Sequence, residues 1–160
     1  MLTRRRLLIV LGTGGGVVAA AAAGFALLPG EETATGFPVI RYGKESCMFC
    51  GMTIGEERFA AAWRPKAGRD EHFDDIGCMV NASRHKDPGP ETKFFVHDYN
   101  DGSWVDAGAA SYVISPSIKT PMAYGLAALA GKDAAESLSA QQKGRLLTWA
   151  GVVENLEKKG

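Results

Sequence analysis

The sequence predicts an α+β fold with a mainly antiparallel sheet, built from two similar β-hairpin-plus-helix units and preceded by one N-terminal transmembrane or signal helix. Short apolar segments come in pairs around turn residues, which is typical of antiparallel hairpins. After the first pair, Ile76, Met79 and Val80 recur at helical spacing. A single long uncharged run, rich in Gly and Ala, comes before this whole pattern.

The first unit is expected between residues 58 and 90. Residues 58–65 and 70–75 form the antiparallel pair, with the turn at Gly68. The helix follows over residues 76–86, and Pro88-Gly89-Pro90 ends it.

The second unit begins with a hairpin whose turn is Asn100-Asp101-Gly102, an Asx-Gly turn signal. A further strand, a loop and two helices separated by Gly131 follow, with Asp133 as the expected cap of the second helix. The C-terminal segment is compatible with either a strand or a helix. The expected elements are strands 92–99, 102–107 and 110–115, the loop 116–121, helices 122–131 and 133–143, and the C-terminal segment 145–159.

The N-terminus predicts export. Arg4, Arg5 and Arg6 precede the uncharged run Leu7–Leu28, which is long enough to cross a bilayer and leaves the arginines on the cytoplasmic side. The same residues resemble a twin-arginine signal, so a retained anchor and a cleaved signal both remain open. We therefore divide the chain into an anchor or signal (1–30), a linker (31–42) and one domain (43–160). The domain is expected at the inner membrane on its periplasmic side, or free in the periplasm after cleavage.

Charge and motifs exclude several classes of function. The chain has 18 basic and 18 acidic residues, which leaves no basic footprint for nucleic acid. It also has no Ser/His/Asp constellation, no phosphate-binding Gly-rich loop and no carboxylate pair with a reason to be perturbed. We therefore expect a protein that is not an enzyme.

The stretch CMFCGM, residues 47–52, holds two of the three cysteines. The C-x-x-C spacing of Cys47 and Cys50 allows two thiolates to bind one metal ion, or a disulfide to form. A structural zinc site would need more ligands than this chain supplies at regular spacing. Met52 adds a soft thioether donor, which favours Cu(I) over zinc, and Met122 lies after Pro121 where it can serve as a second one.

Each of these residues also has a plain structural interpretation. Cys47 and Cys50 can form an ordinary disulfide of an exported protein, and methionines usually fill gaps in a core. Cys78 and Met79 are expected to pack in the core, because they lie in or next to the helical apolar stripe. His97 is expected to be a strand histidine bonded to a neighbour such as Asp98. The remaining histidines, His72 and His85, are expected at the surface.

Five blocks of the sequence together resemble the NosL family of exported copper-binding accessory proteins for nitrous oxide reductase. They span about residues 40 to 155 and read CMFCGM, FDDIGCM, FFVHDY, WVDAGAASYV and TPMAYGLAAL. The resemblance implies a Cu(I) chaperone acting in denitrification, with nitrous oxide reductase or its assembly machinery as partner. It also implies an α+β domain of two β-hairpin-and-helix units.

The resemblance also implies which residues hold the copper. The second cysteine and the methionine of the first block fall on Cys50 and Met52, and the later methionine falls on Met122. Cys47 matches the first cysteine, with a role in metal transfer or in a disulfide. Many family members are lipoproteins, whereas this chain has no cysteine before Cys47 and must be anchored or exported differently.

Two other interpretations remain at this stage. A thiol-disulfide oxidoreductase would use Cys47 and Cys50 and would not need Met52. A structural module stapled by those two cysteines would have only a partner-binding role. Within the copper interpretation, the client is either nitrous oxide reductase or another periplasmic cuproenzyme, such as a haem-copper oxidase.

Overall fold

The computed structural model describes residues 36–158. The expected N-terminal helix (1–30) and the start of the linker (31–35) lie outside these residues. Within 36–158, no helix is both long enough and apolar enough to cross a bilayer.

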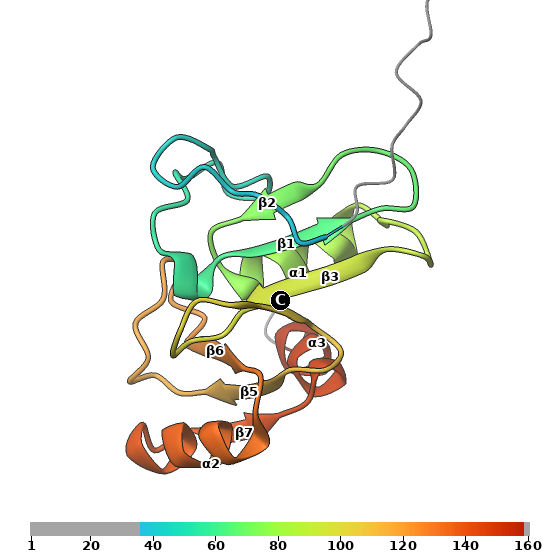
Figure 1. The fold of residues 1–160 in the computed structure, drawn as a ribbon. Coiled ribbons are helices and arrows are strands. Elements are labelled where there is room, and N and C mark those ends of the chain that lie inside the picture. Colours follow the sequence, from blue (N-terminus) through green and yellow to red (C-terminus); the bar gives the residue numbers. More distant parts are fainter. Residues whose placement is uncertain (1–35, 159–160) are drawn as a thin grey trace, which may run out of the picture. The chain divides into compact units, whose positions relative to one another are not determined.

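The described residues form two antiparallel sheets with helices packed on them (Figure 1). The four-stranded sheet has the order β2-β1-β3-β4, with strands β1 (Ala61–Arg64), β2 (Glu71–Phe73), β3 (Lys93–His97) and β4 (Trp104–Asp106). The three-stranded sheet has the order β6-β5-β7, with strands β5 (Ser111–Ile114), β6 (Leu126–Leu129) and β7 (Arg145–Leu147). The helices are α1 (Ile76–His85), α2 (Lys132–Gln141), α3 (Trp149–Glu157) and a short 3₁₀ turn, η1 (Glu57–Phe59).

The two sheets repeat one topology. In each, an antiparallel pair is followed by a helix and then by a third strand that pairs with the first strand of that unit. The repeat is β1-β2-α1-β3 in one unit and β5-β6-α2-β7 in the other. The predicted α+β class and its two similar units are therefore confirmed. The second unit, however, does not begin with the hairpin that turns at Asn100-Asp101-Gly102, because the strands of that hairpin, β3 and β4, complete the first sheet.

Most of the predicted elements are present. The pairs β1–β2 and β3–β4 are the two expected hairpins, β5 matches the expected strand 110–115, and α1 buries Ile76, Met79 and Val80 as its apolar stripe. The C-terminal segment holds both candidates, first β7 and then α3.

The predicted helix 122–131 is wrong, since this segment contains a turn and then β6. All four residues of β6 are buried: Leu126 and Ala128 face α1 and α3, while Ala127 and Leu129 face α2. A strand covered on both faces is apolar throughout and has no period of two. The expected cap of the next helix is also wrong, because α2 begins after Gly131 and Asp133 lies in its first turn.

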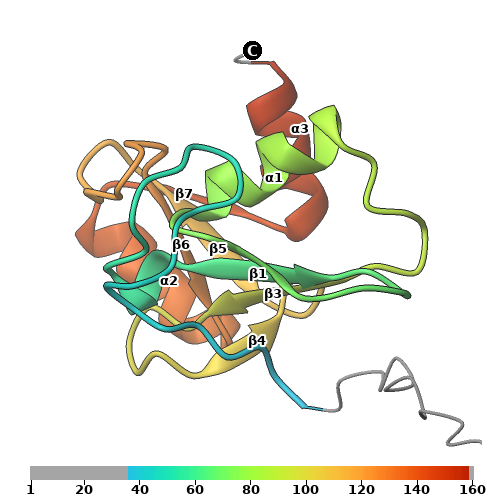
Figure 2. The same ribbon diagram turned by 90° about the horizontal axis from the view of Figure 1, so that it is seen from above.

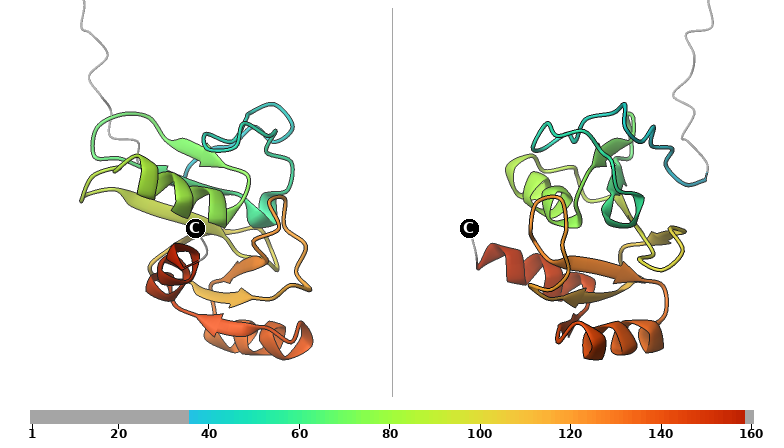
Figure 3. Two further views of the ribbon diagram at one scale, coloured as in Figure 1. Left: turned by 180° about the vertical axis from the view of Figure 1, so that it is seen from behind. Right: turned by 90° about the vertical axis from the view of Figure 1, so that its left-hand side faces the viewer.

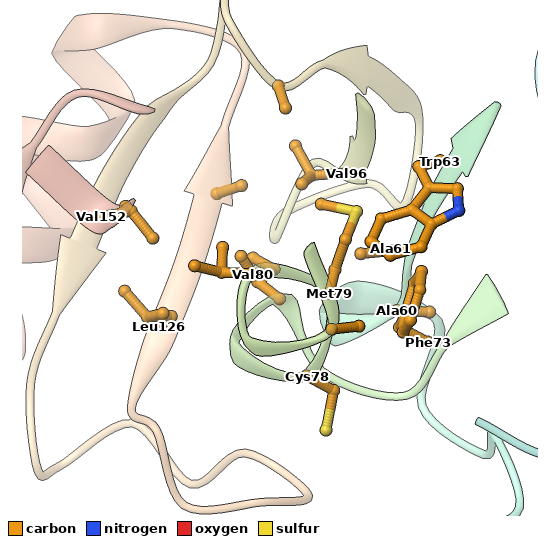
Figure 4. Packing of buried hydrophobic residues seen from close by; sticks show 14 of the residues in the cluster. Ala60, Ala61, Trp63, Phe73, Cys78, Met79, Val80, Val96, Leu126 and Val152 are labelled. Carbon is orange, nitrogen blue, oxygen red and sulfur yellow. The ribbon is translucent and has the colours of Figure 1, made fainter. Parts of the chain in front are cut away.

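The three-stranded sheet lies between two parts of the core. On one side of the three-stranded sheet, α1 and α3 lie side by side against the larger cluster, while α2 covers the opposite face (Figures 2 and 3). Trp63, Phe73, Met79 and Val96 pack together within this larger cluster (Figure 4). Asp98 joins the sheets, because its carboxylate accepts from the Ala130 backbone N–H at 2.7 Å and its backbone bridges Ala128. The resulting scaffold holds the N-terminal end of α1 against two loops.

Candidate metal site

The first loop at this point is the CMFCGM stretch. The Cys47 N–H donates to the Met52 carbonyl at 2.7 Å, and the Gly51 N–H donates to the Cys47 carbonyl at 2.9 Å. Gly51 has a φ of +77°, a conformation that costs a glycine little but a residue with a Cβ more. This closed loop turns Cys47 inward, where it is 3% exposed, and leaves Cys50 half-buried.

The loop is fastened to the edge of the four-stranded sheet. The Met48 N–H donates to the carbonyl of His72 in β2 at 2.9 Å. The chain then leaves β2 through Asp74 and Asp75 and enters α1 directly. Both cysteines are therefore held beside the connection between β2 and α1.

Asp75 is the N-cap of α1, and its carboxylate accepts from the Gly77 N–H at 2.8 Å. This cap places Cys78 in the first turn of the helix. Figure 4 shows the Cys78 side chain pointing away from Met79 and from the rest of the labelled core. Cys78 is fully buried, as predicted, yet it lies on the face of α1 that meets the CMFCGM loop.

Four potential ligands converge at this junction. The sulfur atoms of Cys47, Cys50 and Cys78 and one carboxylate oxygen of Asp74 all lie within 4.8 Å of one another. All three cysteines are free thiols. Three sulfurs at this spacing are suited to a soft, low-coordinate ion such as Cu(I), and adding the carboxylate gives four donors, the number that a divalent ion such as zinc also accepts.

Asp74 is the polar member of this cluster. Its side chain is 1% exposed, and Oδ1 accepts from the Cys50 thiol at 3.4 Å. The other oxygen, Oδ2, is buried and has no hydrogen-bond partner among the described residues. A buried carboxylate oxygen without a partner is costly, so this corner of the site is suited to a cation or a further donor.

The three thiols of this cluster differ in pKa. The Cys78 thiol donates to the Cys47 sulfur, and this bond lowers the pKa of Cys47 to about 6. Burial raises the pKa of Cys50 to about 11, and the hydrogen bond to Cys47 raises that of Cys78. Cys47 is therefore the thiolate of the metal-free site, while Cys50 and Cys78 must lose protons to become anionic ligands.

The two predicted methionine ligands lie in different settings. Met52 is 49% exposed and follows Cys50 on the same loop. Met122 is half-buried on the second loop, and its backbone N–H donates to Asp75 Oδ2 at 3.1 Å. Asp75 therefore fixes both the first turn of α1 and the loop that carries Met122.

Tyr124 is a further contact between that loop and α1. Its ring lies so close to Gly77 that an added Cβ there would be 2.2 Å from Cδ2 and 2.3 Å from Cγ. Its hydroxyl accepts from Asn81 at 3.0 Å. Burial raises the pKa of Tyr124, with added contributions from the nearby Cys78 and Cys50. Gly77 is thus the residue that lets the Met122 loop approach the cysteines.

The histidines take no part in this cluster. His97 is buried, donates from Nδ1 to the Gly102 carbonyl at 2.6 Å and accepts at Nε2 from the Tyr42 hydroxyl at 2.7 Å, so the predicted Asp98 partner is wrong. The surface prediction is wrong for His72, whose side chain is 16% exposed and donates to Glu45 at 2.6 Å. It is confirmed for His85.

Comparison with protein families identifies the family of this chain. The NosL family model matches residues 38–156, nearly all of the described chain. The chain belongs to the NosL family. A search of curated proteins found no match.

Among solved structures, the crystal structure of the copper chaperone NosL from Shewanella denitrificans has a similar fold. Its TM-score is 0.60 at 19% sequence identity, over 72% of this chain and 93% of that one. At this identity the similarity is informative about the fold. It agrees with the two-sheet α+β architecture described above.

Proposed function

We propose that this NosL-family chain is an exported Cu(I) metallochaperone that delivers copper for assembly of the copper centres of nitrous oxide reductase. The observation that carries the proposal is the cluster of three free thiols, with Met52 on one adjoining loop and the Met122 loop tied to the same helix end. The family membership and the copper chaperone named among similar structures support it.

Soft ligands explain why Cu(I) is the favoured cargo. Thiolates and thioethers prefer Cu(I), and neutral thioethers limit the negative charge that the site must bury. In this proposal Cys50, Met52 and Met122 bind the copper with Cys47. Cys78 donates a hydrogen bond to Cys47 and lies close enough to share the ion.

The different burial of these ligands suits a carrier. Cys47 and Cys78 are almost inaccessible, whereas Cys50 is half-buried and Met52 is exposed. An incoming acceptor ligand therefore reaches Cys50 and Met52 first and can replace the ligands one at a time. The function is exchange of a bound ion rather than chemical conversion of a substrate.

Export places the carrier where its client is assembled. In this proposal residues 1–30 anchor the domain to the inner membrane on its periplasmic side, or direct it to the periplasm if they are cleaved.

The direct test is copper transfer. The full chain loaded with Cu(I) is mixed anaerobically with copper-free nitrous oxide reductase, and copper in the separated acceptor is measured over time. We expect transfer to be faster than from a small-molecule Cu(I) complex at the same free copper concentration, and to be lost in Cys50→Ala. Transfer no faster than from the small complex would contradict the chaperone role.

A second candidate is a thiol-disulfide oxidoreductase, favoured by the lowered pKa of Cys47 beside two further thiols. It predicts that reduction of a disulfide substrate depends on Cys47 and Cys50 and is unchanged in Met52→Leu and Met122→Leu. A further variant of the copper proposal keeps the same site with another periplasmic cuproenzyme as acceptor. Repeating the transfer experiment with copper-free haem-copper oxidase separates the two clients.

A further inference from the structure

A pocket of about 540 Å³ is lined in part by the loop that carries Met122. One wall is formed by residues 114–116, 118–120 and 123–125, and the other by the turn 143–145. The Ser115 hydroxyl donates to the Gln142 carbonyl at 2.6 Å and so joins the two walls.

The lining of this pocket is cationic above an apolar floor. Ile114, Ile118 and the Tyr124 ring supply apolar surface, and the charged residues are Lys119, Lys143 and Arg145. No acidic residue lines the pocket. In a chain with equal numbers of acidic and basic residues, three cations without a carboxylate are a local excess of positive charge.

Two of these cations are available to a ligand. Within residues 36–158, neither Lys119 nor Lys143 takes part in an ion pair. The Lys119 ammonium donates to the neutral Pro116 carbonyl at 3.0 Å, which leaves its charge uncompensated. Arg145 differs, because it also contributes to a lowered pKa of Glu154 on α3, after the larger effect of Lys158.

Backbone strain is concentrated at the same place. Ala123 (φ +57°) and Lys143 (φ +49°) are the non-glycine residues with positive φ in the described part of the chain, and both line the pocket. Such conformations persist where the surrounding structure imposes them, and they are frequent at ligand-binding sites. Here they shape the two opposite walls.

The pocket shares a wall with the metal site. Tyr124 lines the pocket and packs on Gly77 of α1, one residue before Cys78. Between Thr120 and Tyr124, Met122 is bonded to Asp75 at the start of that helix. A ligand in the pocket would therefore lie against the loop that carries Met122, and none of the three cysteines lines the pocket.

We propose that this pocket binds an acidic segment, with one apolar side chain, of the protein that receives the copper. The carboxylates of that segment meet Lys119 and Lys143, and its apolar side chain fills the floor beside Tyr124. Charge complementarity with a pocket that lacks acidic groups is the reason for choosing this occupant. The inference rests on the proposed carrier function, because the occupant of the pocket is part of the protein that receives the copper.

The first experiment measures peptide binding to the full chain by fluorescence anisotropy. The probe is a labelled peptide EELEE, and the matched control peptide is QQLQQ. The pocket variant is Lys119→Glu with Lys143→Glu, and the control variant reverses two exposed lysines outside the pocket, Lys66→Glu with Lys93→Glu. Both variants change the net charge equally, and thermal unfolding monitors whether each is folded.

We expect EELEE to bind the parent and QQLQQ not to bind. The pocket variant should weaken EELEE binding by about tenfold or more, since each reversed charge turns attraction into repulsion, and salt should weaken the parent complex. The Lys66/Lys93 variant should bind like the parent. Failure of EELEE to bind, or equal losses in both variants, would overturn the proposal.

A parallel Cu(I) titration separates this inference from the proposed function. Parent and pocket variant should bind Cu(I) equally, because Lys119 and Lys143 supply no copper ligand, while transfer to copper-free nitrous oxide reductase should be slower from the variant. Absence of Cu(I) binding in the parent would refute the carrier function itself. Normal Cu(I) binding with unchanged transfer from the variant would refute only the acidic-segment site.

Discussion

Gly77→Ala tests how the Met122 loop is docked on α1. Alanine near the start of a helix normally stabilises it relative to glycine, by about 0.5 to 1 kcal/mol. Here the new Cβ would lie 2.2 Å from Tyr124 Cδ2 and 2.3 Å from Cγ, well inside a normal carbon contact of about 3.5 to 4 Å. Since rotation about χ2 leaves Cγ in place, the overlap is removed only if χ1 changes and the ring leaves its position on α1, or if the loop moves.

Overpacking of this kind costs about 1 to 3 kcal/mol, so we expect Gly77→Ala to lower the free energy of unfolding by about 1 to 2 kcal/mol. In a Tyr124→Ala background the overlap is gone, and the same substitution should be neutral or stabilising by up to about 1 kcal/mol. The resulting coupling energy is about 2 kcal/mol, measured by urea unfolding of the four reduced, metal-free proteins. If Gly77→Ala stabilises both backgrounds equally, Tyr124 does not pack on this helix end.

Three further predictions concern the thiols and the junction of the sheets. Cys78→Ala removes the hydrogen bond that holds the pKa of Cys47 at about 6, so the pKa of Cys47 should rise towards the ordinary value of 9.0. Thiolate absorbance measured against pH reports this pKa. An unchanged titration curve would contradict the hydrogen bond. The pKa of Cys47 is lower in the folded protein than in the unfolded chain, so its thiolate contributes to the free energy of unfolding. In the reduced metal-free protein this contribution should be complete above pH 9 and should be lost as the pH falls towards 6. In urea unfolding at several pH values, Cys47→Ala should lose that part of the pH dependence, and an identical pH profile would refute the assignment. Asp98→Ala removes the carboxylate that accepts from the Ala130 N–H, and should lower the free energy of unfolding by about 2 to 4 kcal/mol, measured by urea unfolding. A loss below about 1 kcal/mol would mean that this link between the sheets is weak.

The periodic part of the fold could be predicted from the sequence. Helix α1 has one buried face, and its stripe of Ile76, Met79 and Val80 appears at helical spacing in the chain. Strand β6 could not be distinguished from a helix, because α2 covers one of its faces and α1 with α3 the other. Burial on both sides removes the alternation that identifies a strand.

From the residues alone, the sequence identifies the candidate site most clearly where its members lie in one motif, while Met122 is assigned to the site through the family resemblance. Cys47, Cys50 and Met52 lie in one motif and stand out by their spacing. The sequence does not identify Asp74 and assigns Cys78 to the core, because tertiary packing alone brings the β2–α1 connection against the CMFCGM loop. One signal for Cys78 is present in the sequence. With Asp75 as the N-cap, Cys78 lies in the first turn of α1, close to Asp74, the other buried carboxylate.

The most direct test of the central claim is an anaerobic Cu(I) titration of the full chain against a chromophoric competing ligand. The parent is compared with Met52→Leu and Met122→Leu, which keep the volume and apolar character of the side chains but remove the soft sulfur. We expect one tightly bound Cu(I) in the parent and at least about tenfold weaker binding in each variant, equivalent to about 1.4 kcal/mol. Unchanged Cu(I) affinity in both variants would contradict it and would make the two methionines packing residues beside a thiol cluster with another role.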